Sequence, residues 1–386
     1  MAKAWTAEQL AEESVRLIAW NQHVRGGYTA SPLFAHYGYG WLRDGSFTAY
    51  SMDLSGRHES AALFHEWVCR IIERKRAQIE DLISRKSRGE YIERRDFLHT
   101  RYQLDGRDDA DSEWGHFQLD GYGTWLWGLS THLRMTGHSS IPASFRSAVD
   151  AVYAYLEAFW EYTNFDCWEE YSEFVHPATL ACIYGGLQAI AELSGSGKTP
   201  ALCEHIREFL LQHAIHPDGY FVKSLRPLYP EGRVEYEFGL DGVDASLLWL
   251  CEPFHVFEPE HPAMQATIER IGADLRTAQG GVRRYAGDSY YGGGEWLLLT
   301  AWYGWTAWAQ GQWETAEETL GWIVSKADEL GRMPEQVPDA LVNRSGYEDW
   351  VNRWGPPASP LLWSHAMFVI LHHHIRKSAS QRQAEG

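Results

Sequence analysis

The chain has 386 residues, of which 45% are hydrophobic and 22% charged, a globular balance with ample apolar mass for a core. Its formal net charge of −18 argues against nucleic acid or an anionic membrane as partner, because both repel an acidic surface. No apolar run is long enough to span a bilayer, so we expect a protein without a membrane partner.

Helical spacing of apolar residues recurs along the chain, between loops rich in glycine and aromatic residues. Residues 221–237 have little helical period and are predicted to hold short strands, and a further helix should begin within 241–246. The polar residues 377–386 should be loosely ordered. The other predicted helices are, in chain order, 6–25, 46–55, 58–87, 122–133, 144–160, 178–193, 200–214, 262–275, 295–310, 314–330 and 360–375.

About a dozen helices in 386 residues give roughly 32 residues per helix and loop, as expected for stacked helical hairpins. Residues capable of chemistry lie in alternate loops. A double ring with an even number of helices would place all of those loops on one face. The pattern therefore predicts an all-α toroid with a single pocket, and no linker or change in composition divides it into domains.

The cysteines and the N-terminus both favour a cytoplasmic protein. Five cysteines are odd in number and widely spaced, and none forms a C-x-x-C motif, which indicates reduced thiols. The first residues lack the apolar core of a signal peptide, and Thr6 with Gln9 instead matches a helix capping box.

Nineteen tryptophans and twenty tyrosines are unusually many. Flat aromatic faces often line sugar-binding clefts, because they stack on the C–H faces of pyranose rings. Tryptophan also simply fills large cores, and composition alone does not separate the two interpretations.

The best candidates for chemistry are the adjacent Glu169 and Glu170, which follow Asp166-Cys167-Trp168. A carboxyl in an apolar, tryptophan-lined setting stays protonated as a general acid, and a carboxylate on another loop can serve as general base. A separation of ~6.5–9.5 Å would admit a water and invert configuration, whereas ~5–5.5 Å would make the second group a nucleophile. The sequence gives no distance, and two adjacent glutamates are also typical of a solvated helix end.

Arg43 and Asp44 place a donor and an acceptor beside the ring of Trp41, an arrangement that suits sugar hydroxyls. The same pair is also typical of a salt bridge at a helix N-terminus, which is the more frequent case for a bare pattern. Asp288 near Arg284 has the same two interpretations.

His372, His373 and His374 are the obvious candidates for metal ligands. Adjacent positions on a helix point about 100° apart, so three in a row do not ligate one ion, and we expect no metal. The glycines at 292–294 follow no strand and match no nucleotide-binding pattern. We therefore expect no cofactor.

Taken in order, the loop motifs resemble those of glycoside hydrolase family 15, the glucoamylase family. Each motif is modest alone, but five or more in the right order over almost the whole chain make coincidence implausible. The motifs are Tyr37-x-Tyr39-x-Trp41-x-Arg43-Asp44, Trp114-Gly115-x-x-Gln118-x-Asp120-Gly121, Asp166-x-Trp168-Glu169-Glu170, Arg284-Tyr285-x-x-Asp288-x-Tyr290-Tyr291 with Trp296, Pro334-Glu335-Gln336, and Trp363-Ser364-His365-Ala366.

This resemblance implies an (α/α)6 barrel over residues 1–376, a flexible tail over 377–386, and exo-acting, inverting hydrolysis of a terminal α-glucoside with release of β-D-glucose. Carried over by motif, Glu169 would be the general acid and Glu335 the general base, with Tyr37 near the catalytic water and Tyr290 orienting the Tyr37 hydroxyl. The terminal glucose would be clamped by Arg43 and Asp44, with Arg284 as a further hydroxyl donor, and Glu170 would contact the leaving-group sugar. The pocket walls would be Trp41, Trp168 and Trp363, with Trp114 beside the acid.

Three departures from the family's pattern matter. Cys167 stands where fungal members usually have leucine, which concerns the lining of the site and leaves the acid assignment intact. Bacterial members commonly carry an N-terminal β-sandwich, whereas here the first barrel helix begins near Thr6. No starch-binding module follows the barrel either. Such a bare barrel predicts short, imported, neutral α-gluco-oligosaccharides as substrate, with isomaltose-type α-1,6 links favoured.

Other activities stay open. Within the family they are an α-1,4 glucoamylase and an α,α-trehalase. From a different class, the barrel would be a non-catalytic glucan-binding module, against which the presence of glutamate at both 169 and 335 argues. A polysaccharide lyase on a similar toroid acts on uronates and should carry more cationic loop residues than Arg43 and Arg284.

Overall fold

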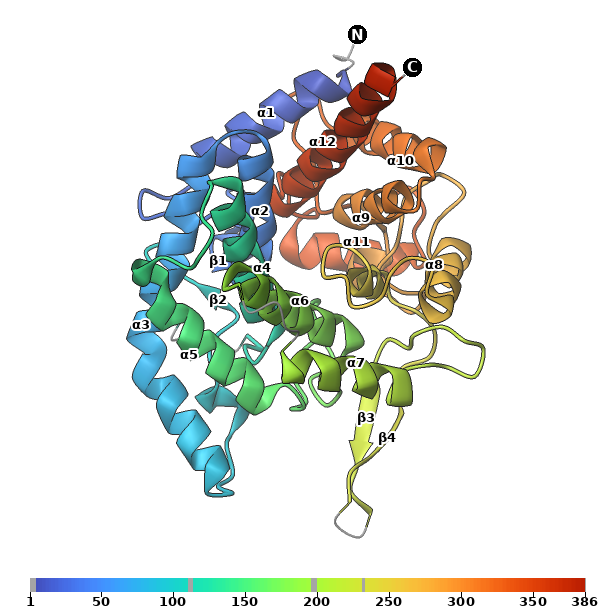
Figure 1. Ribbon diagram of the computed structural model, residues 1–386. Helices are drawn as coiled ribbons and strands as arrows, with labels where there is room; N and C mark the ends of the chain where they lie inside the picture. Colours follow the sequence, from blue (N-terminus) through green and yellow to red (C-terminus); the bar gives the residue numbers. More distant parts are fainter. Residues whose placement is uncertain (1–4, 110–113, 196–199, 231–232, 386) are drawn as a thin grey trace.

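The computed structural model describes residues 5–109, 114–195, 200–230 and 233–385, with side chains up to residue 379. Its helices alternate along the chain between an outer and an inner ring, and the outer helices form much of the perimeter in Figure 1. The inner ring consists of α2 (Leu42–Leu54), α4 (Asp120–Met135), α6 (Pro177–Leu193), the 3₁₀ helix η4 (Ala245–Leu250), α9 (Leu297–Ala309) and α12 (Leu362–Glu385), which packs again on α2. The outer ring consists of α1 (Ala7–Trp20), α3 (His58–Ser87), α5 (Ala143–Phe159), α7 (Ala201–His213), α8 (Pro262–Asp274) and α10 (Trp313–Lys326).

The amino-acid composition of a helix matches the ring in which it lies. The inner helix α9 is apolar on all sides, and ten of its thirteen residues are buried. The outer helix α3 buries only ten of its thirty residues, along one stripe that faces the inner ring. The double ring confirms the predicted toroid.

Glycines allow two inner helices to approach closely. A Cβ on Gly186 of α6 would lie 2.2 Å from the carbonyl oxygen of Gly123 on α4, and one on Gly123 would lie 2.4 Å from the Cys182 carbonyl oxygen. The backbones of α4 and α6 are therefore in direct contact, and any larger residue at either position would force the ring apart.

Aromatic side chains fill the centre of the inner ring. Phe47, Trp249 and Trp302 come from three different inner elements, and all three are fully buried. The ring centroids lie 4.6 Å apart for Phe47 and Trp302 and 5.0 Å apart for Trp249 and Trp302, and Trp363 stacks on Phe47 at 6.2 Å. The barrel is thus a packed core and not a channel, so a cavity opening at one end is closed by these rings.

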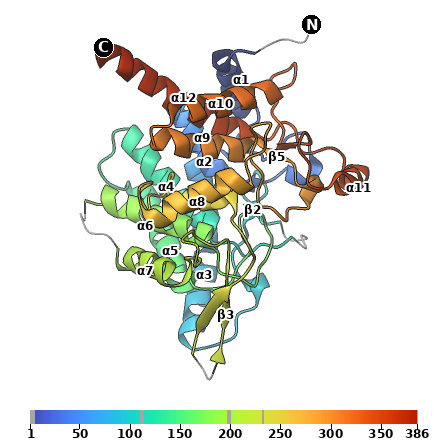
Figure 2. The ribbon, with the colours of Figure 1, turned by 90° about the vertical axis from the view of Figure 1, so that its right-hand side faces the viewer.

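The strands are short and form three antiparallel pairs. Two of the pairs hold loops at the helix starts, and the third is a hairpin that projects from the rings in Figures 1 and 2. The pairs are β1 (Gly40–Trp41) with β2 (Arg101–Tyr102), β3 (Leu225–Leu228) with β4 (Glu235–Phe238), and β5 (Glu295–Trp296) with β6 (Gln336–Val337). The hairpin confirms the short strands predicted within 221–237.

Apart from the C-terminal helix, three helix ends differ from the predictions by four or more residues. One of them is the end of α10, which lies at Lys326 and not at residue 330. α1 ends at Trp20 and not at residue 25, because Asn21 leaves the helix and its side chain donates to the Leu17 carbonyl at 2.8 Å. α2 begins at Leu42 and not at residue 46, so Arg43 and Asp44 lie in its first turn. A carboxylate there also interacts favourably with the positive end of the helix dipole.

Three further segments differ. The helix expected to begin within 241–246 is only the short η4, after which the chain turns at Cys251. No helix is predicted over α11 (Arg344–Trp354). Its apolar residues Tyr347, Trp350, Val351 and Trp354 recur at helical spacing, but the segment is short and mostly polar, and none of its residues is buried. The polar residues 377–385, expected to be loosely ordered, continue α12 as helix, since neither glycine nor proline interrupts them; Gly386 lies outside the described residues.

All five cysteines are buried and unpaired, as predicted for reduced thiols. Within the described parts of the chain, no helix has the length and apolar character needed to cross a bilayer.

Candidate active site

A pocket of about 460 Å³ opens at the end of the barrel where the inner helices begin. Loops before these helices and their first turns form its wall, as the prediction of functional loops on one face requires. All twelve residues to which the resemblance assigns a role line it: Tyr37, Trp41, Arg43, Asp44, Trp114, Trp168, Glu169, Glu170, Arg284, Tyr290, Glu335 and Trp363.

Glu169 is held by two indoles. Trp41 Nε1 donates to Oε1 of Glu169 at 2.5 Å, and Trp114 Nε1 donates to Oε2. Burial raises the pKa of Glu169, the direction that a general acid needs, while the Arg43 guanidinium and the indole N–H groups oppose it.

Asp166 organises the loop around Glu169. Its Oδ1 accepts the backbone N–H of Trp168 at 3.0 Å and that of Glu170 at 2.9 Å. Within this turn Glu169 has a φ of +66°, a left-handed conformation that costs a non-glycine residue about 1–3 kcal/mol. The two hydrogen bonds to Asp166 offset that strain and set the direction of the Glu169 side chain.

Two residues that brace this loop are missing from the sequence analysis. Asp244 accepts the indole N–H of Trp168, with its two oxygens at 3.1 and 3.0 Å. Lys223 is only 4% exposed, and its Nζ lies 3.0 Å from Asp244 Oδ2 and 3.2 Å from the centroid of the Tyr285 ring. The sequence signal is Lys223 itself, which directly follows the apolar run Tyr220-Phe221-Val222. A lysine beside such a run is expected to be buried, and a buried lysine needs a partner of opposite charge.

Glu170 follows Glu169 in the chain but has different partners. Tyr285 donates its hydroxyl to Oε2 of Glu170 at 2.6 Å, and Arg284 Nη2 donates to Oε1 at 3.3 Å. Arg284 is itself held by Asp288, whose Oδ2 accepts from Nε at 2.8 Å. The Arg284–Asp288 pair is thus a buried structural ion pair that also presents the guanidinium to the pocket.

Glu335 enters the pocket from the residue before β6. Pairing of Trp296 with Gln336 and a bond from the Glu335 N–H to the Ala358 carbonyl at 2.8 Å fix its backbone. Tyr37 donates its hydroxyl to Oε1 of Glu335 at 3.1 Å and lies 2.9 Å from the hydroxyl of Tyr290.

The two oxygens of Glu335 differ in their surroundings. Oε2 is buried and has no hydrogen-bond partner among the described residues, so it can accept a proton from a bound water. Burial raises the pKa of Glu335 to about 7, and the Tyr37 hydroxyl and the Arg284 charge oppose the rise.

Arg43 and Asp44 form an ion pair in the first turn of α2, and both residues line the pocket. Arg43 Nη1 donates to Asp120 Oδ2 at 2.8 Å and to Gln118 Oε1 at 3.0 Å, so it is a buried structural ion pair. Its Nε lies 3.3 Å from Asp44 Oδ2, but without hydrogen-bond geometry, and both atoms lack a partner in the described structure. Burial raises the pKa of Asp44 to about 6, with Arg43 opposing. A ligand hydroxyl can therefore bridge these two atoms.

The unpredicted helix α11 supplies two further aromatic residues to the pocket. Trp350 meets Tyr290 edge to face at 4.9 Å, and Trp354 meets His36 in the same manner at 4.8 Å. These rings lengthen the pocket beyond Glu169 and Glu335. The histidines considered as metal ligands lie far along α12, where His374 packs on Trp305 at 5.1 Å.

The pocket and the barrel agree with what is known of other proteins. The sequence model described as Glycosyl hydrolases family 15 matches residues 7–350. The chain belongs to glycoside hydrolase family 15. An isomaltose glucohydrolase of Kribbella flavida is 39% identical to this hydrolase over 370 residues, which are 94% of this chain and 91% of that protein.

Solved structures show the same fold. A wild-type glycosidase superposes on the hydrolase with a TM-score of 0.87 at 38% identity, over 96% of both chains. A bacterial glucoamylase in complex with acarbose has a TM-score of 0.72 at 18% identity, over 95% of this chain and 55% of its own. The predicted (α/α)6 barrel and glycoside hydrolase class are thereby confirmed.

Proposed function

We propose that this hydrolase removes glucose from the non-reducing end of short, neutral α-gluco-oligosaccharides, with α-1,6 links of the isomaltose type preferred and β-D-glucose as product. The observation that carries this proposal is a pocket of about 460 Å³ closed by Trp363 on the buried aromatic plug, with unpaired polar atoms of Asp44, Glu335 and Trp363 at its wall. A closed pocket admits a chain end and not the middle of a chain. The related isomaltose glucohydrolase supports the linkage.

The reaction is a single displacement. Glu169 donates its proton to the glycosidic oxygen, and the bond from that oxygen to the anomeric carbon breaks. Glu335 accepts a proton from a water through its unpartnered Oε2, and the water oxygen bonds to the anomeric carbon from the opposite face. Tyr37 holds the other oxygen of Glu335, and Tyr290 in turn orients the Tyr37 hydroxyl.

Substrate contacts follow from the remaining wall. Arg43 Nε and Asp44 Oδ2 clamp hydroxyls of the terminal glucose, and Trp41, Trp168 and Trp363 enclose its ring. Glu170 and Arg284 face the leaving-group sugar, while Trp114 stays on the acid. Every site residue named by the motifs has a role in this scheme.

The proposal extends to the setting of the protein. We place the whole activity in the barrel over residues 1–376, without a contribution from the residues that follow. Five buried, unpaired cysteines support a reducing, cytoplasmic compartment. The net charge of −18 supports a neutral substrate over nucleic acid.

A substrate panel tests the function. We expect turnover of isomaltose to exceed that of maltose, longer dextrins and trehalose, and anomer-resolved NMR should show β-glucose first. If trehalose or maltose were preferred, the linkage would be wrong. Release of α-glucose first would overturn the inverting mechanism, and binding of all these sugars without turnover would favour a glucan-binding module.

A further inference from the structure

A cluster of three buried side chains lies away from the pocket. Asp53 near the end of α2, His65 on α3 and His132 on α4 each offer one ligand atom, and these three atoms lie within 4.8 Å of one another. Asp53 lies ten positions after Arg43 along α2, a rise of about 15 Å at 1.5 Å per residue. The cluster is therefore separate from the glycosidase site.

His65 is the unexplained member of this cluster. It is fully buried, and neither of its ring nitrogens has a hydrogen-bond partner among the described residues. Buried polar groups in native proteins are nearly always satisfied, so a histidine in this position needs a partner that the chain itself does not supply. Its ring centroid lies 5.1 Å from that of His132.

The other two members already have the spacing of metal ligands. His132 Nδ1 lies 3.0 Å from both carboxylate oxygens of Asp53. Around one ion with bonds of about 2.0–2.2 Å, neighbouring ligand atoms lie roughly 3–3.5 Å apart. We propose that Asp53, His65 and His132 form a binding site for a divalent transition-metal ion, zinc above all, that joins α2, α3 and α4.

The chemistry of the surroundings fits such an ion. His58 Nδ1 lies 2.8 Å from Asp53 Oδ1 and orients the carboxylate, as outer partners of metal ligands do. Two imidazoles and one carboxylate are a donor set that zinc prefers over magnesium or calcium.

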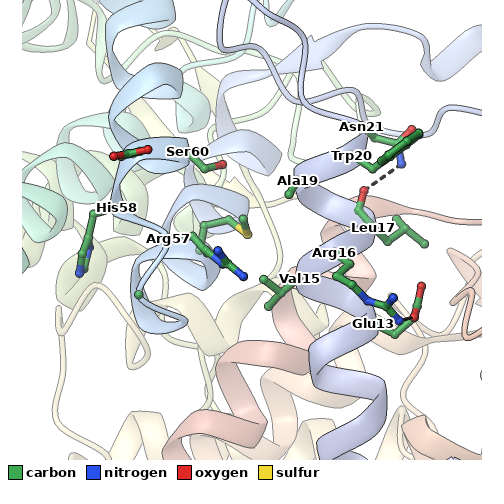
Figure 3. A pocket seen from close by; sticks show the side chains of 13 residues that line it. Glu13, Val15, Arg16, Leu17, Ala19, Trp20, Asn21, Arg57, His58 and Ser60 are labelled. Atoms are coloured by element: carbon green, nitrogen blue, oxygen red, sulfur yellow. Dashed lines mark hydrogen bonds and ion pairs between the residues drawn. The ribbon is translucent and has the colours of Figure 1, made fainter.

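An approach to the site exists from solvent. Figure 3 shows a groove with side chains of α1 on one side and Arg57, His58 and Ser60 on the other. The His58 side chain is 42% exposed there and touches Asp53 at its inner end.

Metal binding to the full chain tests the proposal. Chelator-treated protein is titrated with Co²⁺, whose visible absorption reports coordination number, and then with Zn²⁺. We expect one Co²⁺ per chain in a low-coordinate nitrogen and oxygen site, displaced by Zn²⁺, and a Tm that rises with Zn²⁺ concentration. If the chelator-treated wild-type protein bound neither Co²⁺ nor Zn²⁺ at one ion per chain, the proposal would be overturned.

Variants locate the site. His65→Leu should abolish the rise in Tm on adding Zn²⁺, and His58→Gln should weaken binding by roughly 10–100-fold, the loss typical for an outer partner. His205→Leu removes an exposed histidine of α7 and should leave binding unchanged. If His65→Leu bound Co²⁺ as tightly as the wild type, the ion would lie elsewhere and the assignment would be wrong.

Discussion

Glu169 and Glu335 line one pocket, but opposite kinds of structure hold them. Glu169 lies in an irregular loop in a left-handed conformation, and the loop depends on the buried group of Asp166, Lys223 and Asp244. Glu335 lies beside a short strand pair, and the hydroxyl of Tyr37 donates to its carboxylate. The part of the pocket around the proposed acid Glu169 (the acid side) thus depends on buried charged residues behind its loop. The part around the proposed base Glu335 (the base side) depends on tyrosine hydroxyls beside the carboxylate. Substitutions should separate the two sides.

Removing either carboxylate should have the largest effect. Glu169→Gln and Glu335→Ala should each lower kcat by about 10²–10⁴-fold, the usual contribution of general acid–base catalysis, with the circular dichroism spectrum unchanged. Glu173→Gln, an exposed glutamate just after the same loop, is the matched control and should keep full activity. Near-normal kcat on every α-glucoside in both variants would show that the site is wrongly assigned.

The buried lysine gives the next largest effect, and only on the acid side. Lys223→Met leaves Asp244 charged and unpaired in the core, which should lower the free energy of unfolding by about 3–5 kcal/mol and reduce kcat through the Trp168 and Glu169 loop. Urea denaturation and steady-state kinetics measure both. Lys326→Met breaks the more exposed pair with Asp339 and should cost less than about 1 kcal/mol. Equal costs would contradict a special role for Lys223.

The base side should respond in its pH dependence. Glu335 must be ionised, so kcat/KM should rise with pH through the Glu335 pKa of about 7, and it should fall again where Glu169 loses its proton. Tyr37→Phe removes a hydrogen bond that favours the carboxylate, so the midpoint of the acidic limb should move up by about one pH unit.

Tyr285→Phe is the matched control for that shift. It removes a hydroxyl from Glu170 and not from Glu335, so the acidic limb should stay in place. If both variants moved the limb equally, the two sides of the pocket would not be separable.

The smallest effect should come from α11. Trp350→Ala should raise KM for isomaltose about two- to tenfold with little change in kcat, because an aromatic contact of about 0.5–1.5 kcal/mol is lost at the pocket wall. Trp20→Ala removes an 87% exposed tryptophan of α1 and should change neither constant. A large fall in kcat for Trp350→Ala would instead show that α11 positions Glu335 through Tyr290.

Several features could be predicted from the sequence because they depend on local patterns. Apolar periodicity located most of the helices, and their alternation indicated the double ring. All twelve residues that the ordered motifs assign to the site line the pocket, whereas Trp350 and Trp354 of the same pocket belong to no motif. Several of these motifs are informative because they combine aromatic and charged residues, as Trp41 with Arg43 and Trp168 with Glu169, where packing alone does not require either.

Other features depend on contacts between distant residues, which periodicity does not encode. Lys223 and Asp244 lie 21 positions apart and become a pair only when β3 is placed against the Trp168 loop. The apolar residues of α11 recur at helical spacing, but that spacing does not say where the helix packs, and only its contact with the segment that contains Tyr290 reveals its place at the pocket. Residues Asp53, His65 and His132 come from three helices, so only the ring places them together. The sequence thus determined which side chains can do chemistry. Only the tertiary structure decided which residues hold those side chains in place, because such support requires proximity in space.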